Sequence, residues 1–242
     1  MSDPGMNAAD IRKELKSMAD PYKAAILQRF FKTGPGQYGE GDTFIGVMVP
    51  QSRQVAKKFG QLPLKEVRTL LYSRIHEERL VALLILVWRY SVSIKEREEI
   101  VKFYLDNIKQ VNNWDLVDLS APNILGAQLV DRDDRRLLYR LAGSENVWER
   151  RIAILATHRF IRNGDFSDTL KIARMLMQDR HDLIHKAAGW MLREVGKRDA
   201  AAEEAFLEKH FSAMPRTMLR YAIERLPESK RRRYKKNPID RC

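Results

Sequence analysis

Apolar residues return every three or four positions along most of the chain, as in Leu137, Leu138 and Leu141. A period near 3.6 predicts amphipathic α-helices, whereas convincing strand-like alternation is hard to find. Residues 123–214 contain no proline, which fits a long succession of helices. Segment 80–90 is apolar nearly all round, so we expect its helix to be buried on most sides. The pattern therefore predicts an all-α protein.

A short polar turn, a basic or polar residue and an apolar helix follow one another several times along the chain. Aligning these segments gives equivalent anchors at Val81, Arg151, Lys186 and Arg220, and the missing anchor in the double gap falls at Asp118. A period of about 35 residues with two helices per unit is typical of HEAT-like repeats. We therefore expect an α-solenoid, a superhelix of HEAT-like repeats with a concave face.

The same pattern indicates the limits of the folded region. We assign residues 6–229 to a single HEAT-like repeat domain, in which 33–43 form a loop rich in Gly. Residues 1–5 are typical of an expression scar. Residues 230–242 contain seven Lys and Arg against one Asp, so we expect a basic C-terminal tail.

Charge and cysteine content narrow the function. The chain has 44 Lys and Arg against 32 Asp and Glu, a formal net charge of +12 at pH 7, which points to an acidic partner and most often to nucleic acid. The single cysteine, Cys242, excludes an intrachain disulfide and a cysteine-based metal cluster. The longest apolar run, residues 80–88, is too short to cross a bilayer. We expect a cytoplasmic protein associated with the nucleoid and not with a membrane.

The repeat register places the anchors on one surface. Equivalent positions of stacked repeats line up, so Asp118 joins a row with the cations Arg151, Lys186 and Arg220 on the concave face. Cations spaced by one repeat can follow a phosphate backbone. Neighbouring cations favour the ionised, acceptor-only form of the carboxylate in this row.

Two tryptophans lie one helical turn from members of this row. Trp114 precedes Asp118 by four residues, and Trp190 follows Lys186 by four. Aromatic faces beside a carboxylate suit a planar cation, such as a purine alkylated at N3 or N7. Cleavage of its N-glycosidic bond passes through an oxocarbenium-like sugar, which an ionised carboxylate stabilises. The base needs no general acid because it leaves neutral.

Four blocks of sequence stand out along the chain: residues 113–118, residues 148–155, residues 186–194, and Phe44-Ile45-Gly46-Val47 followed by Pro50 and Arg53. Two of the blocks are specific in combination, a Trp-x-x-x-Asp motif and a Lys-Ala-x-Gly-Trp-x-Leu-Arg-Glu motif. Together the blocks resemble the AlkD-type DNA alkylation-repair glycosylases, and the resemblance spans roughly residues 10–230.

The resemblance implies a superhelix of HEAT-like repeats that binds DNA on its concave face. It implies removal of cationic 3-alkyl and 7-alkyl purines without insertion of the lesion into a deep base pocket. By position, Trp114 and Trp190 would contact the sugar and backbone of the lesion nucleotide, and Asp118 would be the catalytic carboxylate. We assign DNA binding to the cations of these repeats: Arg151, Lys186, Arg193 and Arg220.

The expected activity is that of a monomeric, monofunctional DNA glycosylase acting on duplex DNA in base excision repair. The chemistry requires no cofactor, and no free catalytic amine is evident, so we expect no lyase activity. His181 and His185 have the spacing of a metal pair, but no His-Glu-x-x-His pattern accompanies them, so we expect no metal.

Structural alternatives accompany these assignments. Trp114 and Trp190 could belong to the core, as we expect of Trp148 and Trp88. Asp118 could serve only to complement a helix dipole. The alternative for the whole chain is a non-catalytic repeat scaffold that binds nucleic acid or protein.

Structural roles are also expected for Arg151, a member of the row, and for Asp115 and Gly189 near it. Arg151 could join a salt-bridge ladder between repeats instead of contacting DNA. Asp115 suits a capping or salt-bridging role better than Asp118 does. Gly189 inside a helix costs about 1 kcal/mol relative to Ala, which predicts a close approach of another backbone, from protein or DNA.

Overall fold

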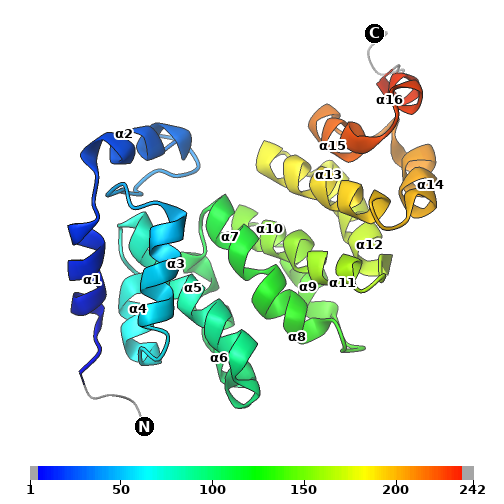
Figure 1. The fold of residues 1–242 in the computed structure, drawn as a ribbon. Coiled ribbons are helices and arrows are strands. Elements are labelled where there is room, and N and C mark those ends of the chain that lie inside the picture. Colours follow the sequence, from blue (N-terminus) through cyan, green and yellow to red (C-terminus); the bar gives the residue numbers. More distant parts are fainter. Residues whose placement is uncertain (1–4, 236–242) are drawn as a thin grey trace. The chain divides into compact units, whose positions relative to one another are not determined.

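The computed structural model describes residues 5–235, which fold as helices joined mostly by short loops, with a longer connection over residues 31–48 (Figure 1). Within these residues there is no β-strand, only an isolated parallel bridge between Thr43 and Ile75. The predicted all-α class is confirmed. The chain forms two compact units, one ending at Ile124 and the other beginning at Leu125.

In the first unit the long helix α5 is the element against which α1, α3, α4, α6 and α7 pack. Residues 80–86 of α5 are all buried, as the apolar run predicts. Burial of these side chains on every side explains why this helix lacks a polar face along its middle. The helices of the unit are α1 Ala8–Ser17, α2 Pro21–Phe30, α3 Val49–Lys58, α4 Leu64–Leu71, α5 His76–Val92, α6 Arg97–Asp106 and α7 Trp114–Ser120.

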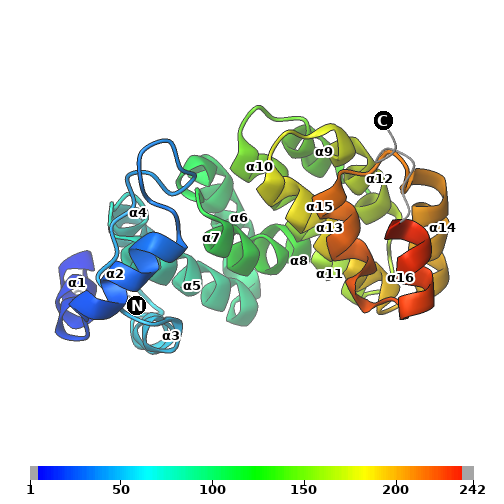
Figure 2. The same cartoon turned by 90° about the horizontal axis from the view of Figure 1, so that it is seen from above.

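In the second unit α13 has the central place, with α10, α12, α14 and α15 packed against it. Figure 2 shows α15 lying along α13. The short π-helix Pro122–Gly126 precedes α8. The helices are α8 Ala127–Leu129, α9 Arg136–Ala142, α10 Val147–Ala156, α11 His158–Arg162, α12 Ser167–Met175, α13 Asp182–Gly196, α14 Ala200–His210, α15 Arg216–Ala222 and α16 Glu228–Lys235.

The predicted repeat register falls on equivalent positions of these helices. Helices α7, α10, α13 and α15 begin at residues 114, 147, 182 and 216, so four of the five predicted anchors are the fifth residues of their helices. The remaining anchor, Val81, is the sixth residue of α5. In the second unit α9 packs against α10 and α12 against α13, as the first and second helices of two pairs. Helix α14 precedes α15 in the chain and packs against α13. The helical-repeat solenoid class is confirmed, while the single domain and its concave basic face stay predictions.

Residues 230–235 of the segment expected as a basic C-terminal tail belong to helix α16. Tyr234 is 2% exposed, and its hydroxyl donates to Glu208 of α14 at 3.1 Å. This buried aromatic ring packs α16 against its neighbour. Residues 236–242 of the expected tail, and 1–4 of the expected scar, lie outside the described residues.

At Gly189 the backbones of α13 and α15 approach each other closely. A Cβ atom at Gly189 would lie 2.3 Å from the carbonyl oxygen of Met218 and 2.7 Å from Cβ of Tyr221. The expected close approach is therefore confirmed, and the approaching backbone belongs to the protein. Any side chain at this position would force the two repeats apart.

We expect Gly189→Ala to lower the free energy of unfolding by about 1–3 kcal/mol, because the added methyl group overpacks the contact with Met218. Urea denaturation of wild type and variant measures this difference. Gly143→Ala is the matched control, since a Cβ at Gly143 meets nothing closer than 3.7 Å. Equal stability of the two variants would contradict the prediction.

Candidate DNA-binding and active site

Helix α7 carries the predicted Trp114 as its first residue and Asp118 as its fifth. Asn113 fixes the start of this helix: its Oδ1 accepts from the Trp114 backbone N–H at 2.8 Å. The Asn113 Nδ2 donates to Asp42, 71 positions earlier, at 3.0 Å. Both Trp114 and Asp118 are half-buried. The structure thus brings these two predicted residues together on one short, capped helix of the first unit.

The Trp114 indole is packed by aromatic rings from α2 and the chain that follows it. It stacks on Phe31 with ring centroids 5.1 Å apart and planes 10° apart. Phe30 meets the indole edge-on at 5.9 Å, and its own side chain is 61% exposed. Phe31 in turn stacks on Phe44 at 4.8 Å. These contacts restrict the ring and leave the tryptophan half-exposed.

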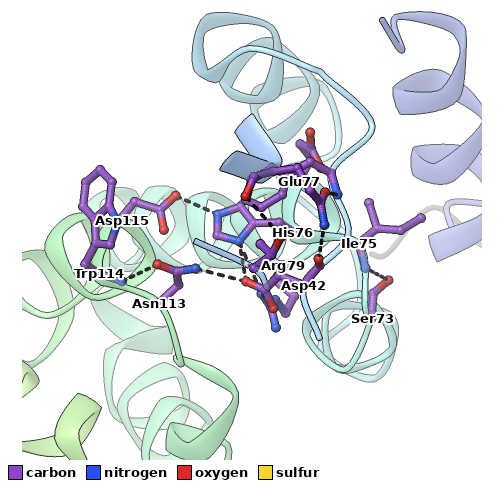
Figure 3. A network of polar contacts seen from close by, with 12 residues as sticks. Asp42, Ser73, Ile75, His76, Glu77, Arg79, Asn113, Trp114 and Asp115 are labelled. Carbon is purple, nitrogen blue, oxygen red and sulfur yellow. Dashed lines mark hydrogen bonds and ion pairs between the residues drawn. The ribbon is translucent and has the colours of Figure 1, made fainter. Parts of the chain in front are cut away.

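Beside Trp114 lies a buried polar group that we call the Asp42 cluster: Asp42, His76, Arg79, Asn113 and Asp115 (Figure 3). The His76 ring contacts Asp115 through Nε2 at 2.7 Å and Asp42 through Nδ1 at 3.1 Å. The Arg79 guanidinium pairs with Asp42 at 2.6 Å. The expected salt bridge of Asp115 is confirmed, with His76 as its partner.

The cluster balances charge in a buried place. Burial raises the pKa of the Asp42 carboxyl, but hydrogen bonds and charge from His76 and Arg79 outweigh it, so the net pKa lies below its usual value. Burial lowers the pKa of the His76 imidazole, but its bonds to Asp115 and Asp42 outweigh that and raise it. Two carboxylates and two cations therefore neutralise each other when His76 is protonated.

The Phe44–Val47 block of the sequence has a supporting role. The carboxylate of Glu77 accepts hydrogen bonds from the backbone N–H groups of Ile45, Gly46 and Val47 at 2.8 to 3.3 Å. Gly46 has φ +85°, and a Cβ there would lie 2.1 Å from the Asp20 carbonyl oxygen. The buried acid at the start of α5 therefore fixes the segment that delivers Asp42 and Phe44 to the site.

In the second unit Trp190 lies on α13 and is half-buried. Its indole Nε1 donates to Glu194 Oε1 at 2.9 Å, and Lys197 pairs with the same oxygen at 2.6 Å. The His158 ring approaches the indole at 6.1 Å. Burial raises the pKa of the Glu194 carboxyl, but the bonds from Lys197 and Trp190 outweigh it, so the net pKa is lowered. An ionised Glu194 thus orients Trp190.

The four predicted DNA-binding cations differ in exposure. Arg151 is 5% exposed and donates to the Leu183 carbonyl of the next repeat at 2.7 Å. This contact joins two repeats, as the structural alternative for Arg151 expects, although its partner is a carbonyl. Lys186 is half-buried and pairs with Asp182 at 2.8 Å.

The remaining two cations lie toward the end of the second unit. Arg193 is half-buried and pairs with Glu224 of the helical turn after α15. Arg220 is exposed, with its guanidinium 5.8 Å from the centroid of the Tyr221 ring. Of the four, Arg220 is the most open to a ligand, and the contacts of all four with phosphate stay predictions.

Sequence reasoning missed the residues that hold Trp114 in place. Phe31 and Asp42 stand in or beside a segment expected to be loop, and His76 and Arg79 stand in a polar run before an apolar helix. One signal in the sequence could have indicated them: several charged residues directly precede segment 80–90, which is expected to be buried. Charged side chains at a buried helix start need ion-pair partners. Trp148, expected in the core, is buried, whereas Trp88 is only partly buried.

The two histidines with metal-pair spacing have other contacts. The Nδ1 atom of His181 accepts from the Leu183 N–H at the start of α13, and His185 Nε2 lies 2.7 Å from the Asp179 carbonyl oxygen. Among residues 5–235, no three His, Cys, Asp or Glu side chains are grouped to hold a metal ion. None of the helices described here has the length and apolarity needed to span a membrane.

The fold and the sequence both resemble those of known proteins. The structure resembles that of a "Predicted DNA alkylation repair enzyme from Enterococcus faecalis", with a TM-score of 0.67, 18% sequence identity, and coverage of 87% of this chain and 98% of that chain. No curated protein matches the sequence at a significant level. Residues 11–226 match the family described as "DNA alkylation repair enzyme". The chain therefore belongs to the DNA alkylation repair enzyme family.

Proposed function

We propose that this protein is a monofunctional DNA glycosylase that hydrolyses the N-glycosidic bond of cationic N3- or N7-alkylated purines in duplex DNA. Membership of the repair family supports a role in alkylation repair. The observation that carries the proposed chemistry is the pairing of Trp114 and Asp118 on α7, whose start is fixed by Asn113. In this proposal the protein is a monomer that lies in the cytoplasm and associates with the nucleoid.

In the proposed reaction the bond between C1′ and the purine nitrogen breaks, and its electron pair neutralises the positive base. The sugar develops oxocarbenium character, which the Asp118 carboxylate stabilises through charge. A water oxygen then bonds to C1′ and loses a proton, leaving an abasic site. Trp114, with Trp190, holds the lesion nucleotide by aromatic contact and cation–π attraction. These steps use no cofactor, and without a catalytic amine the strand stays intact.

Base release from duplex DNA with one 7-methylguanine or one 3-methyladenine tests this function. Wild type is expected to release the free base and leave an uncleaved abasic strand, whereas unmodified duplex stays intact. Salt-sensitive DNA binding without release of either base would contradict the glycosylase and favour the non-catalytic scaffold. Strand cleavage under neutral conditions would contradict the monofunctional assignment.

We expect Arg220→Ala to weaken binding to duplex DNA and to reduce the slope of log affinity against log salt by about 1, because one phosphate contact is lost. Arg220 is the exposed member of the predicted cation row. Fluorescence anisotropy at several salt concentrations measures the slope. Arg225→Ala is the matched control, since Arg225 is also exposed but lies off the repeat register. Indistinguishable slopes in the two variants would remove Arg220 from the interface.

A further inference from the structure

Two separate routes lead from His76 to Trp114. The first is a column of rings: His76 stacks on Phe44 at 4.5 Å and 22°, and Phe44 stacks on Phe31 at 4.8 Å and 25°. Phe31 then stacks on Trp114, so the column ends on the indole. The His76 ring also contacts Phe31 directly, with centroids 5.0 Å and planes 41° apart. The second route is the 2.7 Å contact between His76 Nε2 and Asp115, the residue after Trp114 on α7.

Both routes start at the buried His76 ring, and they end at the Trp114 indole and at the start of α7. His76 is 1% exposed, whereas Trp114 at the other end of the column is half-exposed. A displacement of His76 therefore changes the support of the indole face and the start of α7 at once. The same start of α7 is tied to Asp42 through Asn113, and Asp42 also contacts His76.

We propose that His76 is a positioning residue for Trp114, holding the indole face through Phe44 and Phe31 and the helix start through Asp115. The effect of His76 on catalysis rests on the proposed function, in which Trp114 contacts the lesion nucleotide. A ring without nitrogens would also fill this space in the core, so packing alone does not explain why the residue is a histidine.

The protonated ring fits the contacts best. Both ring nitrogens face carboxylate oxygens, and only the imidazolium donates from both. The charged groups that face the ring are Asp42 from the loop before α3, Asp115 from α7 and Arg79 from α5. Arg79 lies 3.3 Å from Nδ1, farther than Asp42 at 3.1 Å, and is itself paired with Asp42. Loss of the proton would therefore break one of the two carboxylate contacts.

The sign of the pH dependence follows from these contacts. The His76 pKa in the folded protein is raised above its usual 6.5. The support that the imidazolium gives to Trp114 is then complete below pH 6.5 and is lost as pH rises through the raised pKa. A probe on Trp114 should report this change on the alkaline side.

The indole N–H resonance of Trp114 in an NMR spectrum is such a probe, and it does not depend on catalysis. Trp114→Phe identifies it among the four tryptophans. His76→Gln is expected to shift this resonance and abolish its titration, while the Trp190 resonance stays in place. Phe44→Leu removes the ring that stacks on both His76 and Phe31 and leaves no buried charge unpaired, so it is expected to shift the resonance as well.

Tyr104→Phe is the matched control for a buried hydrogen bond in the same unit. Tyr104 is 1% exposed, and its hydroxyl contacts Ser120 at 3.0 Å. Its loss is expected to leave the Trp114 resonance and its titration unchanged. An unchanged Trp114 resonance in folded His76→Gln and Phe44→Leu proteins would overturn the proposal, as would a Trp114 resonance in wild type that does not titrate.

Single-turnover base release gives the second readout. His76→Gln is expected to lower the rate about 10- to 100-fold through misplacement of Trp114, with DNA affinity within about twofold of wild type. An unchanged rate would overturn the catalytic part of the proposal. If wild type itself releases no base, the proposed function fails, and the Trp114 resonance still decides whether His76 positions the indole.

Discussion

Asp118→Asn is expected to lower the rate of base release at least about 100-fold while leaving affinity for lesion-containing duplex nearly unchanged. The substitution keeps the size of the side chain and removes its charge. The charge matters most when the sugar becomes cationic, so its loss raises the barrier far more than it weakens the ground-state complex. Single-turnover release and anisotropy, measured on the same protein preparation, separate the two quantities.

The matched control is Asp106→Asn, an exposed acid near the end of α6 in the same unit, paired with Lys102 at 2.7 Å. It changes the net charge by the same amount and is expected to leave release unchanged. If folded Asp118→Asn lost binding and release to the same extent, Asp118 would be a binding residue and not the catalytic carboxylate. An unchanged release rate would exclude it from the chemistry altogether.

The helical-repeat fold could be predicted because it depends on local spacing. The apolar period fixes the helices, and the recurrence of one helix start about every 35 residues fixes their register. Asp118, Arg151, Lys186 and Arg220 occupy the same fifth position in their helices for this reason. The close approach at Gly189 could also be predicted, since glycine within a helix needs a packing cause.

The support of the site could not be predicted in the same way. Asn113 contacts Asp42 across 71 positions, and the segment between them gives no pattern that pairs the two. The polar run at the start of α5 has the composition of a solvated helix start, yet His76 and Arg79 are buried because partners arrive from a distant loop and from α7. Ion pairs with residues distant in the sequence offset the free-energy cost of burying these charged side chains. The local composition does not reveal those partners.

The pairing of cations is a second feature hidden from the sequence. The repeat register correctly places Arg151 on the fifth position of its helix, but its guanidinium reaches the Leu183 carbonyl, 32 positions later. Similarly, Tyr234 holds α16 through Glu208, 26 positions earlier, so a basic run that has the composition of a tail begins as a helix. In both cases the partner lies in another helix of the unit.

Arg79→Met is expected to lower the free energy of unfolding by about 3–5 kcal/mol, because it leaves Asp42 without its shortest ion pair in a buried place. Both side chains are nearly inaccessible, at 5% and 6% exposure. Guanidinium denaturation measures the loss. The matched control is Lys102→Met, which breaks an exposed pair of similar length and is expected to cost under about 1 kcal/mol.

The double variant Arg79→Met with Asp42→Asn separates an unpaired charge from a lost contact. Because the neutral amide removes the uncompensated carboxylate, it should recover part of the stability that Arg79→Met loses. Without recovery, Asp42 would be acting mainly as the acceptor for Asn113 and His76, and its charge would matter little. Whether or not stability recovers, the hydrogen bond from Asn113 to residue 42 is weaker in the double variant. The start of α7, which carries Trp114, should therefore be held less firmly, as should the core of the unit.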